Sequence, residues 1–333
     1  MTRTGPTISL LVTVAALLML LAAPGWTKGM VTYSFDDGLA SVYADALPIL
    51  KKHHQKATVG IVYDRVLSGN DDYLDVSQVM EMQNSGWEVA SHGLTHKRPT
   101  EIPQYLYEEP IIGWVKDDRH AGVYEANYTY ELIGQLWENG KPLEPAASLK
   151  EVARKRGSYF FDTLVGAVHI HPYADEHPKK LDIRSISYQR EMSDSRRNLE
   201  DLGFKVTTYV TPYNYWTPEM REVCRYYYQQ AANGGESANF KGKMDRYWLK
   251  RYFIHTLGPV QEVIRLLKKN VIEKDGWVIF CFHGIEDETG WQPWSAENLE
   301  HLAAWIQQEG IRVVTIAEGV EIMERGFLDS LFD

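Results

Sequence analysis

The stretch Ser34-Phe35-Asp36-Asp37-Gly38, together with His92-Gly93-Leu94-Thr95-His96, decides how the chain is interpreted. The first stretch follows the apolar run Met30-Val31-Thr32-Tyr33, which predicts a buried strand that ends in two carboxylates and a glycine turn. The second follows Trp87-Glu88-Val89-Ala90, another predicted strand. Imidazole and carboxylate both suit a divalent first-row ion, so strand ends that bring these side chains together are typical of a metal site.

Each half of this pattern has a simpler explanation when it is taken alone. An Asp-Asp-Gly sequence is usually a solvated turn. Two histidines four residues apart can share one face of a helical turn, but such pairs are more often surface or core residues than ligands. The joint occurrence of both halves at predicted strand ends favours a site.

Two later segments, Thr211-Pro212-Tyr213 and Ile279-Phe280-Cys281-Phe282-His283, follow the first two in order. With these four segments the chain resembles the polysaccharide deacetylases, carbohydrate esterase family four. The resemblance runs from about Met30 to Met323 with one large interruption. It implies a hydrolase that removes acetyl groups from a carbohydrate.

Predicted strands and helices alternate along most of the chain. Helices are expected over 40–52, 77–84, 191–202, 258–269 and 298–308, with Ser77 as the cap of the second, and further strands over 57–62, 205–210, 277–282 and 311–315. Such alternation is typical of a parallel sheet. We therefore expect an α/β fold, a distorted seven-stranded (β/α) barrel formed by residues 28–97 and 184–333.

Residues 98–183 have a different pattern and are interpreted as a β-rich insertion on a loop of the barrel. Residues 123–130 alternate, 138–141 carry a turn signal, and 158–162 with 165–170 predict a hairpin. Whether this insertion binds sugar or only braces the barrel is left open. His169 and His171 can face the same side of a strand, but two histidines alone are interpreted as structural.

Composition excludes some classes of function. The chain has 333 residues, is 44% apolar and 24% charged, and carries a formal charge of −10. An acidic chain without a basic stripe is not expected to bind nucleic acid or an anionic membrane. Of its two cysteines, Cys281 lies on a predicted core strand and is expected to be a buried free thiol.

Residues 1–27 have the pattern of a secretory signal peptide. Arg3 precedes an uncharged apolar run, Ile8 to Ala23, that ends in small residues. The run is short for a membrane-spanning helix, so we expect its removal and no stable membrane span. The mature protein is expected to be secreted, in the periplasm or outside the cell.

The resemblance also implies roles for individual residues. Asp37, His92 and His96 would hold a divalent metal, with Zn²⁺ as the default and Co²⁺, Fe²⁺ or Mn²⁺ fitting the same ligands. Asp36 would be the general base. The backbone N–H of Tyr213 would stabilise the oxyanion.

His283 would protonate the leaving amine, because its ordinary pKa is close to neutral. The residues themselves leave alternatives open: Asp36 can orient rather than act as base, the two aspartates can exchange roles, and His283 can be a core histidine. Trp291 and Trp294 follow His283 and are the candidate substrate-binding residues, because aromatic rings beside a site can stack on a sugar. The alternative is that these rings simply pack in the protein.

Two family features are missing here. Val210 stands where the third motif usually begins with Arg, and the fourth motif is not present as such, with Asp245-Arg246-Tyr247-Trp248 only a faint echo. We expect Arg251 to supply the missing support for the catalytic carboxylate.

The function predicted from these features is metal-dependent removal of N-acetyl groups from an amino-sugar glycan by metal-activated water. The partner would be an acetylated polysaccharide or oligosaccharide. An O-acetyl ester hydrolase with the same machinery is one alternative. A glycan-binding protein that has lost catalysis through its altered third and fourth motifs is another.

Overall fold

The computed structural model describes residues 29–96, 108–128, 133, 135–186, 189–286 and 290–332. Its main sheet consists entirely of parallel strand pairs, in the order β15-β14-β13-β3-β2-β1-β17-β16. The strands of this path are β1 (Met30–Phe35), β2 (Thr58–Ile61), β3 (Glu88–Ser91), β13 (Val206–Val210), β14 (Gln230–Asn233), β15 (Leu249–Lys250), β16 (Tyr252–Phe253) and β17 (Trp277–Phe282).

The two edges of this sheet meet at Arg251. β15 pairs with β14, β16 pairs with β17, and only Arg251 separates β15 from β16 in the chain. These two short strands are therefore halves of one strand that closes a ring of seven. β18 (Arg312–Val313) pairs in addition with the start of β1. The expected α/β barrel is confirmed.

Residues along each barrel strand face the interior and the exterior in turn, because successive side chains of a strand point to opposite faces. On β1, Val31 and Tyr33 pack into the large outer cluster, whereas Met30 belongs to a smaller cluster that also contains Ala90, Val210 and Leu249. This smaller cluster fills the barrel, and residues from the start of α10 (Ile316–Phe332) pack against it.

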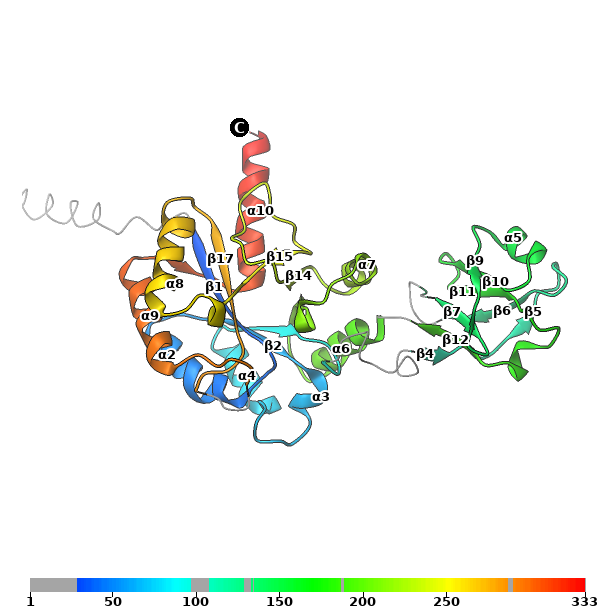
Figure 1. Ribbon diagram of the computed structural model, residues 1–333, viewed down its shortest axis with the longest axis horizontal. Coiled ribbons are helices and arrows are strands. Elements are labelled where there is room, and N and C mark those ends of the chain that lie inside the picture. Colours follow the sequence, from blue (N-terminus) through cyan, green and yellow to red (C-terminus); the bar gives the residue numbers. More distant parts are fainter. Residues whose placement is uncertain are drawn as a thin grey trace, which may run out of the picture.

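Helices cover the outside of the barrel (Figure 1). They are η1 (Val42–Ala46) continuing into α2 (Leu47–Lys52), α3 (Tyr63–Val66), α4 (Val76–Asn84), α6 (Gln189–Asp201), α7 (Pro218–Tyr227), α8 (Val260–Leu267) continuing into η6 (Lys268–Ile272), and α9 (Ala296–Gln308). The five expected helices are all present. The cap of α4 is a correction: Asp75, not Ser77, accepts from the backbone N–H of Gln78 and forms a capping box with that residue.

The strands from Glu108 to Ile186 form two separate small sheets, which Figure 1 shows apart from the barrel and beyond α6. One has the order β5-β6-β11-β10-β9 and the other β4-β12-β7-β8. Their bounds are β4 (Glu108–Pro110), β5 (Val115–Lys116), β6 (Tyr124–Asn127), β7 (Leu136–Glu138), β8 (Lys141–Pro142), β9 (Glu144–Pro145), β10 (Ser158–Asp162), β11 (Ala167–His171) and β12 (Ile183–Ile186), with α5 (Leu149–Arg154) between β9 and β10. The expected hairpin is β10–β11.

A separate hydrophobic cluster supports these two sheets, with Trp114, Leu136 and Val168 among its buried residues. The boundaries 98–183 of the insertion stay a prediction. The expected signal peptide, 1–27, lies outside the described residues. Within the described part of the chain, no helix combines the length and the apolar character needed to cross a membrane.

Candidate functional site

The candidate site lies where the barrel strands end. β1 and β17 run in register up to the pair Phe35↔Phe282, so the residues that follow, Asp36 and His283, leave the sheet side by side. The backbone N–H of Asp36 donates to the Phe282 carbonyl at 2.8 Å. His92 follows β3 in the same way, and its N–H donates to the Ile61 carbonyl at 2.8 Å. In barrels of this kind, the carboxyl ends of the strands carry the catalytic residues.

Asp37, His92 and His96 converge at this edge. Each offers one ligand atom, and the three atoms lie within 4.8 Å of one another. The Asp37 Oδ1 atom is 2.9 Å from His96 Nε2 and 3.7 Å from His92 Nε2. Asp36 is not part of this group. Its carboxylate belongs instead to a cluster with Cys281 and His283, so the geometry pairs Asp37 with the two histidines.

The tautomer and protonation state of His92 suit the binding of a divalent ion. Its Nδ1 lies 2.8 Å from the Val210 carbonyl, which can only accept, so Nδ1 carries the proton and the Nε2 lone pair is available. Burial is the main reason why the pKa of His92 is lowered to about 4, so the ring is neutral at pH 7. A neutral imidazole of fixed tautomer is the form that binds metals.

Backbone strain concentrates around the same place. Asp37, His96, Tyr213 and Asn214 have φ values of 74°, 55°, 55° and 50°, in the left-handed region that residues other than glycine seldom adopt. All four line one cavity. Strained backbone that persists in a fold is often part of a functional site.

Arg65 is a site residue that the sequence did not predict. It follows β2 and donates from Nη1 to Asp37 Oδ1 at 2.9 Å, while its Nη2 lies 3.2 Å from His96 Nδ1. Guanidinium only donates, so His96 Nδ1 accepts in this arrangement. If His96 held a metal through Nε2, its Nδ1 would carry the proton and could no longer accept from Arg65. Arg65 and a metal ion therefore compete for the same two residues.

Asp36 is paired with Arg251. The Asp36 side chain is 3% exposed, and its Oδ1 accepts from Arg251 Nη1 at 2.7 Å and from Ser34 Oγ at 3.4 Å. Burial is the largest influence and would raise the pKa of Asp36, but the charge and hydrogen bond of Arg251 together with His92 and His283 outweigh it, and the pKa lies below its ordinary value. Asp36 is therefore ionised at neutral pH.

The residue that closes the barrel is thus also the one that holds Asp36. Arg251 is 1% exposed, and its Nη2 donates to Asn214 Oδ1 at 3.0 Å. This contact connects the Asp36 pair to the turn that carries Tyr213. Asn214, a neighbour of Tyr213 in sequence, was not predicted as a site residue.

His283 lies next to these groups. Burial is the largest influence on its pKa, which is lowered despite the charges of Asp36 and Asp37. The ring meets the Trp291 ring edge to face, with centroids 5.0 Å apart. Cys281 is a buried free thiol, as expected, and its Sγ lies 3.4 Å from Asp36 Oδ2.

The two predicted tryptophans differ. Trp291 is 55% exposed and lines the cavity. Trp294 is 7% exposed and packs in the core against Phe282, with ring centroids 5.6 Å apart. The expectation that Trp294 contacts a sugar is therefore corrected, because its ring is used in core packing.

Tyr213 stands on the short turn η4 (Pro212–Asn214), at the mouth of the cavity. Its side chain is 47% exposed, and its ring lies 4.6 Å from the His96 ring. The cavity has a volume of about 480 Å³. It is lined by Asp36, Asp37, Leu39, Arg65, Tyr73, His92, His96, Tyr213, Asn214, Phe253, His283 and Trp291.

Glu191, in the first turn of α6, holds the loop between the two histidines. Its carboxylate accepts from the backbone N–H groups of Leu94 at 2.9 Å and Thr95 at 3.1 Å, and from Thr95 Oγ1 at 2.8 Å. Glu191 was predicted only as part of a helix. Local sequence gives no signal for a contact between residues this far apart.

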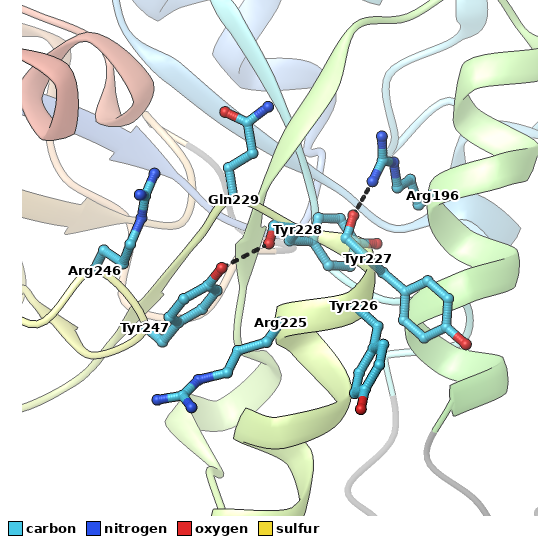
Figure 2. Close-up of a pocket in the computed structure, with 8 residues that line it drawn as sticks. All are labelled: Arg196, Arg225, Tyr226, Tyr227, Tyr228, Gln229, Arg246 and Tyr247. Atoms are coloured by element: carbon cyan, nitrogen blue, oxygen red, sulfur yellow. Dashed lines mark hydrogen bonds between the residues drawn. The ribbon is translucent and has the colours of Figure 1, made fainter. Parts of the chain in front are cut away.

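A second cavity, shown in Figure 2, has different chemistry. It is lined by Arg196, Arg225, Tyr226, Tyr227, Tyr228, Gln229, Arg246 and Tyr247. This set contains no carboxylate or imidazole, so it offers no ligands for a metal. The cavity at the strand ends is the candidate active site.

Comparison with known proteins finds a family that matches the part of the chain containing Asp36, Asp37, His92 and His96. Residues 25–111 match the family model described as polysaccharide deacetylase. YxkH of Bacillus subtilis (strain 168), whose name classes it with the polysaccharide deacetylases, is 35% identical over 81 residues. The matched part is 24% of this chain and 28% of that relative, so the chain spans about a quarter of the relative's length.

Solved structures with a related arrangement include peptidoglycan deacetylase PdaC from Bacillus subtilis. It is 14% identical, with 93% of this chain and 98% of that chain covered and a TM-score of 0.46. The family 4 carbohydrate esterase from Streptomyces lividans is 12% identical, with 86% and 92% covered and a TM-score of 0.45.

The family match confirms the resemblance to polysaccharide deacetylases over residues 25–111. That segment contains Asp36, Asp37, His92 and His96. Tyr213, Arg251 and His283 lie outside it. Tyr213 and His283 are instead placed at the site by the cavity that they line, and Arg251 by its contact with Asp36.

Proposed function

We propose that this protein is a metal-dependent polysaccharide deacetylase that removes N-acetyl groups from an amino-sugar glycan. One observation carries the proposal. In a single cavity, a carboxylate and two imidazoles with metal-ligand spacing lie beside a second carboxylate that is ionised and held by Arg251. The first three groups can bind a cation, and the second carboxylate can act as the general base.

Asp37, His92 and His96 would hold the metal. Zn²⁺ is the first choice for this donor set, and Co²⁺, Fe²⁺ or Mn²⁺ would also fit. When bound, such an ion supplies Lewis acidity, which lowers the pKa of water and polarises a carbonyl. The residues around the ligands fix their orientation: the Val210 carbonyl fixes the His92 ring, and Glu191 fixes the loop that carries both histidines.

Asp36 takes the proton from the water that attacks the acetyl carbonyl. Asp36 is ionised at neutral pH, so its carboxylate is free of a proton and can accept one. The hydrogen bond from Arg251 Nη1 to Oδ1 fixes the carboxylate and leaves Oδ2 for the proton. Among the described residues, Oδ2 is contacted only by the weak donor Cys281 Sγ.

Two groups complete the reaction. The backbone N–H of Tyr213 would donate to the oxyanion that develops on the acetyl carbonyl, and losing one such donor typically costs about 3–4 kcal/mol of barrier. His283 would deliver a proton to the departing nitrogen after taking one up during the reaction, because its lowered pKa leaves the resting imidazole neutral at pH 7. An amine leaves readily only when protonated, so the reaction requires this acid.

The test is acetate release by the purified protein from chitin oligomers, poly-N-acetylglucosamine, peptidoglycan and acetylxylan, with and without a chelator. We expect release from at least one N-acetylated glycan, loss of release with the chelator and recovery on addition of Zn²⁺. Release from acetylxylan alone would identify an O-acetyl ester hydrolase instead. No release from any of them, with metal bound, would contradict the proposal and favour a glycan-binding protein.

We also propose that the protein works outside the cytoplasm. The support for this is the pattern of residues 1–27, a positive residue, an apolar run and small residues. Amino-terminal sequencing of the protein recovered from its host tests the proposal. A mature chain that begins near residue 28 is expected, and a chain that keeps residue 1 in the cytoplasm would contradict it.

A further inference from the structure

We propose that Asp117, Glu125 and His169 form a second divalent-metal site, on the small sheet that contains β5, β6 and β11. Each residue offers one ligand atom, and these atoms lie within 4.8 Å of one another. None of the three lines the cavity at the barrel strand ends. The site is therefore independent of the proposed deacetylase function.

The sheet brings these residues together. Glu125 on β6 is the register partner of Val115 on β5 and of His169 on β11. Directly opposite residues of antiparallel strands lie side by side on one face. Asp117 comes two residues after Val115 and therefore reaches the same face. Its backbone N–H donates to the Val123 carbonyl at 3.0 Å, which holds it next to β6.

One ring nitrogen of His169 is buried and has no hydrogen-bond partner among the described residues. The residue is 5% exposed, and its Nδ1 is buried without a hydrogen bond among the described residues. The carboxylate oxygen Oε2 of Glu125 lies 3.6 Å from this nitrogen, too far for a hydrogen bond. A buried polar atom without a partner costs free energy, and an ion between His169 and Glu125 would remove that cost.

Asp117 is already oriented for such an ion. Its Oδ1 accepts three hydrogen bonds, from the backbone N–H groups of Arg119 and His120 at 2.8 Å each and from His120 Nδ1 at 3.0 Å. Its Oδ2 is approached, among the described residues, only by Arg119 Nη2 at 3.8 Å. The Arg119 side chain is 77% exposed and can move into solvent. Oδ2 is thus available as a ligand.

The donor set selects the class of metal. One imidazole and two carboxylates suit Zn²⁺, Mn²⁺, Fe²⁺ or Co²⁺. Ca²⁺ and Mg²⁺ prefer all-oxygen sites, so the histidine disfavours them. The Glu125 side chain is 44% exposed, which lets water complete the coordination. Because the three ligands lie on β6, on β11 and directly after β5, a bound ion would cross-link neighbouring segments and stabilise the sheet.

The experiment counts metal ions on the full chain. Wild type and variants are stripped with a chelator, dialysed against a slight excess of Zn²⁺, separated from free metal by gel filtration and analysed by mass spectrometry. The variants are Glu125→Gln and His169→Gln in the new site and Asp37→Asn in the cavity. We expect two equivalents for wild type and one for each of these variants.

His171→Gln is the matched control. His171 lies on the same strand as His169, but its Nδ1 contacts the Val152 carbonyl, and it is in none of the candidate metal clusters among the described residues. This variant should keep two equivalents. Glu125→Gln changes a half-exposed side chain, so it keeps the test decisive if His169→Gln fails to fold.

Thermal unfolding gives a second measurement. In the Asp37→Asn background, Zn²⁺ should raise the midpoint of unfolding through the remaining site, and it should not do so when Glu125→Gln is added. Equal metal content in wild type and Glu125→Gln would overturn the new site. Loss of one ion in Glu125→Gln but none in Asp37→Asn would support the new site and contradict the metal ligands of the proposed function.

Discussion

Asp36 and Asp37 are adjacent in sequence but have different partners. Asp36 faces the barrel interior, where Arg251 holds it. Asp37 leaves the strand with a φ of 74° and lies against His96 and Arg65 instead. One left-handed residue is enough to separate the two carboxylates. Their assignment to base and ligand follows from this difference in backbone.

Arg65 leads to a first prediction. It places a positive charge against Asp37 and His96, where a cation would bind, so it opposes the metal. In Arg65→Gln we expect Zn²⁺ to bind more tightly, on the order of tenfold. Competition with a chromogenic chelator measures this. The control is Arg265→Gln, an exposed arginine on α8. Weaker binding in Arg65→Gln would show that Arg65 supports the site instead.

The two tryptophans near His283 give a second prediction. Trp291→Ala should raise KM for the glycan while leaving the free energy of unfolding nearly unchanged, because Trp291 is exposed. Trp294→Ala should destabilise the fold by about 3–5 kcal/mol, because it empties a core position. Steady-state kinetics and urea unfolding of both variants check this. The reverse pattern would contradict the positions of the two rings.

At the scale of elements, the first turn of α6 and the loop after β3 form one unit. Glu191 fixes the loop through Leu94 and Thr95, between the two histidines. Glu191→Ala should therefore weaken Zn²⁺ binding in the cavity by about 10–100-fold, the usual effect of losing a residue that orients the ligands. Glu191→Gln, which keeps one acceptor oxygen, should recover part of the loss.

Glu200→Ala is the control for this third prediction. Glu200 lies on the same helix and pairs with Arg196 at 2.9 Å, away from the loop. It should leave metal binding unchanged. Equal affinities in Glu191→Ala and Glu200→Ala would show that the loop keeps its shape without Glu191.

Elements were predictable from sequence in proportion to the regularity of their pattern. β17 is an unbroken apolar run and was predicted with its observed bounds. β14, β15 and β16 were missed because they are short, with polar residues at Gln230 and Asn233 and the charged Arg251 between the last two. α7 and α10 were missed as well. The cap of α4 was misplaced because Asp75 and Ser77 are both good caps, and the capping box with Gln78 favours Asp75.

Of the candidate site, the motif residues Asp36, Asp37, His92, His96 and His283 could be proposed from sequence because each follows a strand. Supporting residues such as Arg65, Asn214 and Glu191 could not, because their contacts join distant segments without a local pattern. Arg251 was proposed as the partner of the catalytic carboxylate only because Val210 replaces the arginine that usually begins the third motif. The structure places it 2.7 Å from Asp36, and its role there stays a proposal.

At the scale of the whole molecule, the carboxylate of Glu88, at the start of β3, should make the free energy of unfolding depend on pH. Glu88 on β3 accepts from Thr58 Oγ1 at 2.9 Å, the Ala317 N–H at 3.0 Å and Thr208 Oγ1, so it joins β2, β13 and α10. Burial is the largest influence on its pKa and raises it above the ordinary 4.5. The folded protein therefore binds the proton more tightly than the unfolded chain does.

The contribution of Glu88 to stability then falls as pH rises from about 4.5 through its higher folded pKa, and it is constant above that. Glu88→Gln should remove this part of the dependence. We expect the stability of Glu88→Gln relative to wild type to increase between acid and neutral pH in urea unfolding. A difference that does not change with pH would contradict the raised pKa.

The central claim is that the two adjacent aspartates have different roles: Asp37 is a metal ligand, and Asp36 is the general base that accepts the proton. The most direct measurement compares metal content and acetate release in Asp36→Asn and Asp37→Asn, on the glycan that wild type deacetylates. We predict that Asp36→Asn keeps the metal of the cavity and loses acetate release by at least about 100-fold, while Asp37→Asn loses both. Loss of that metal in Asp36→Asn, or acetate release at the wild-type rate in either variant, would contradict the account.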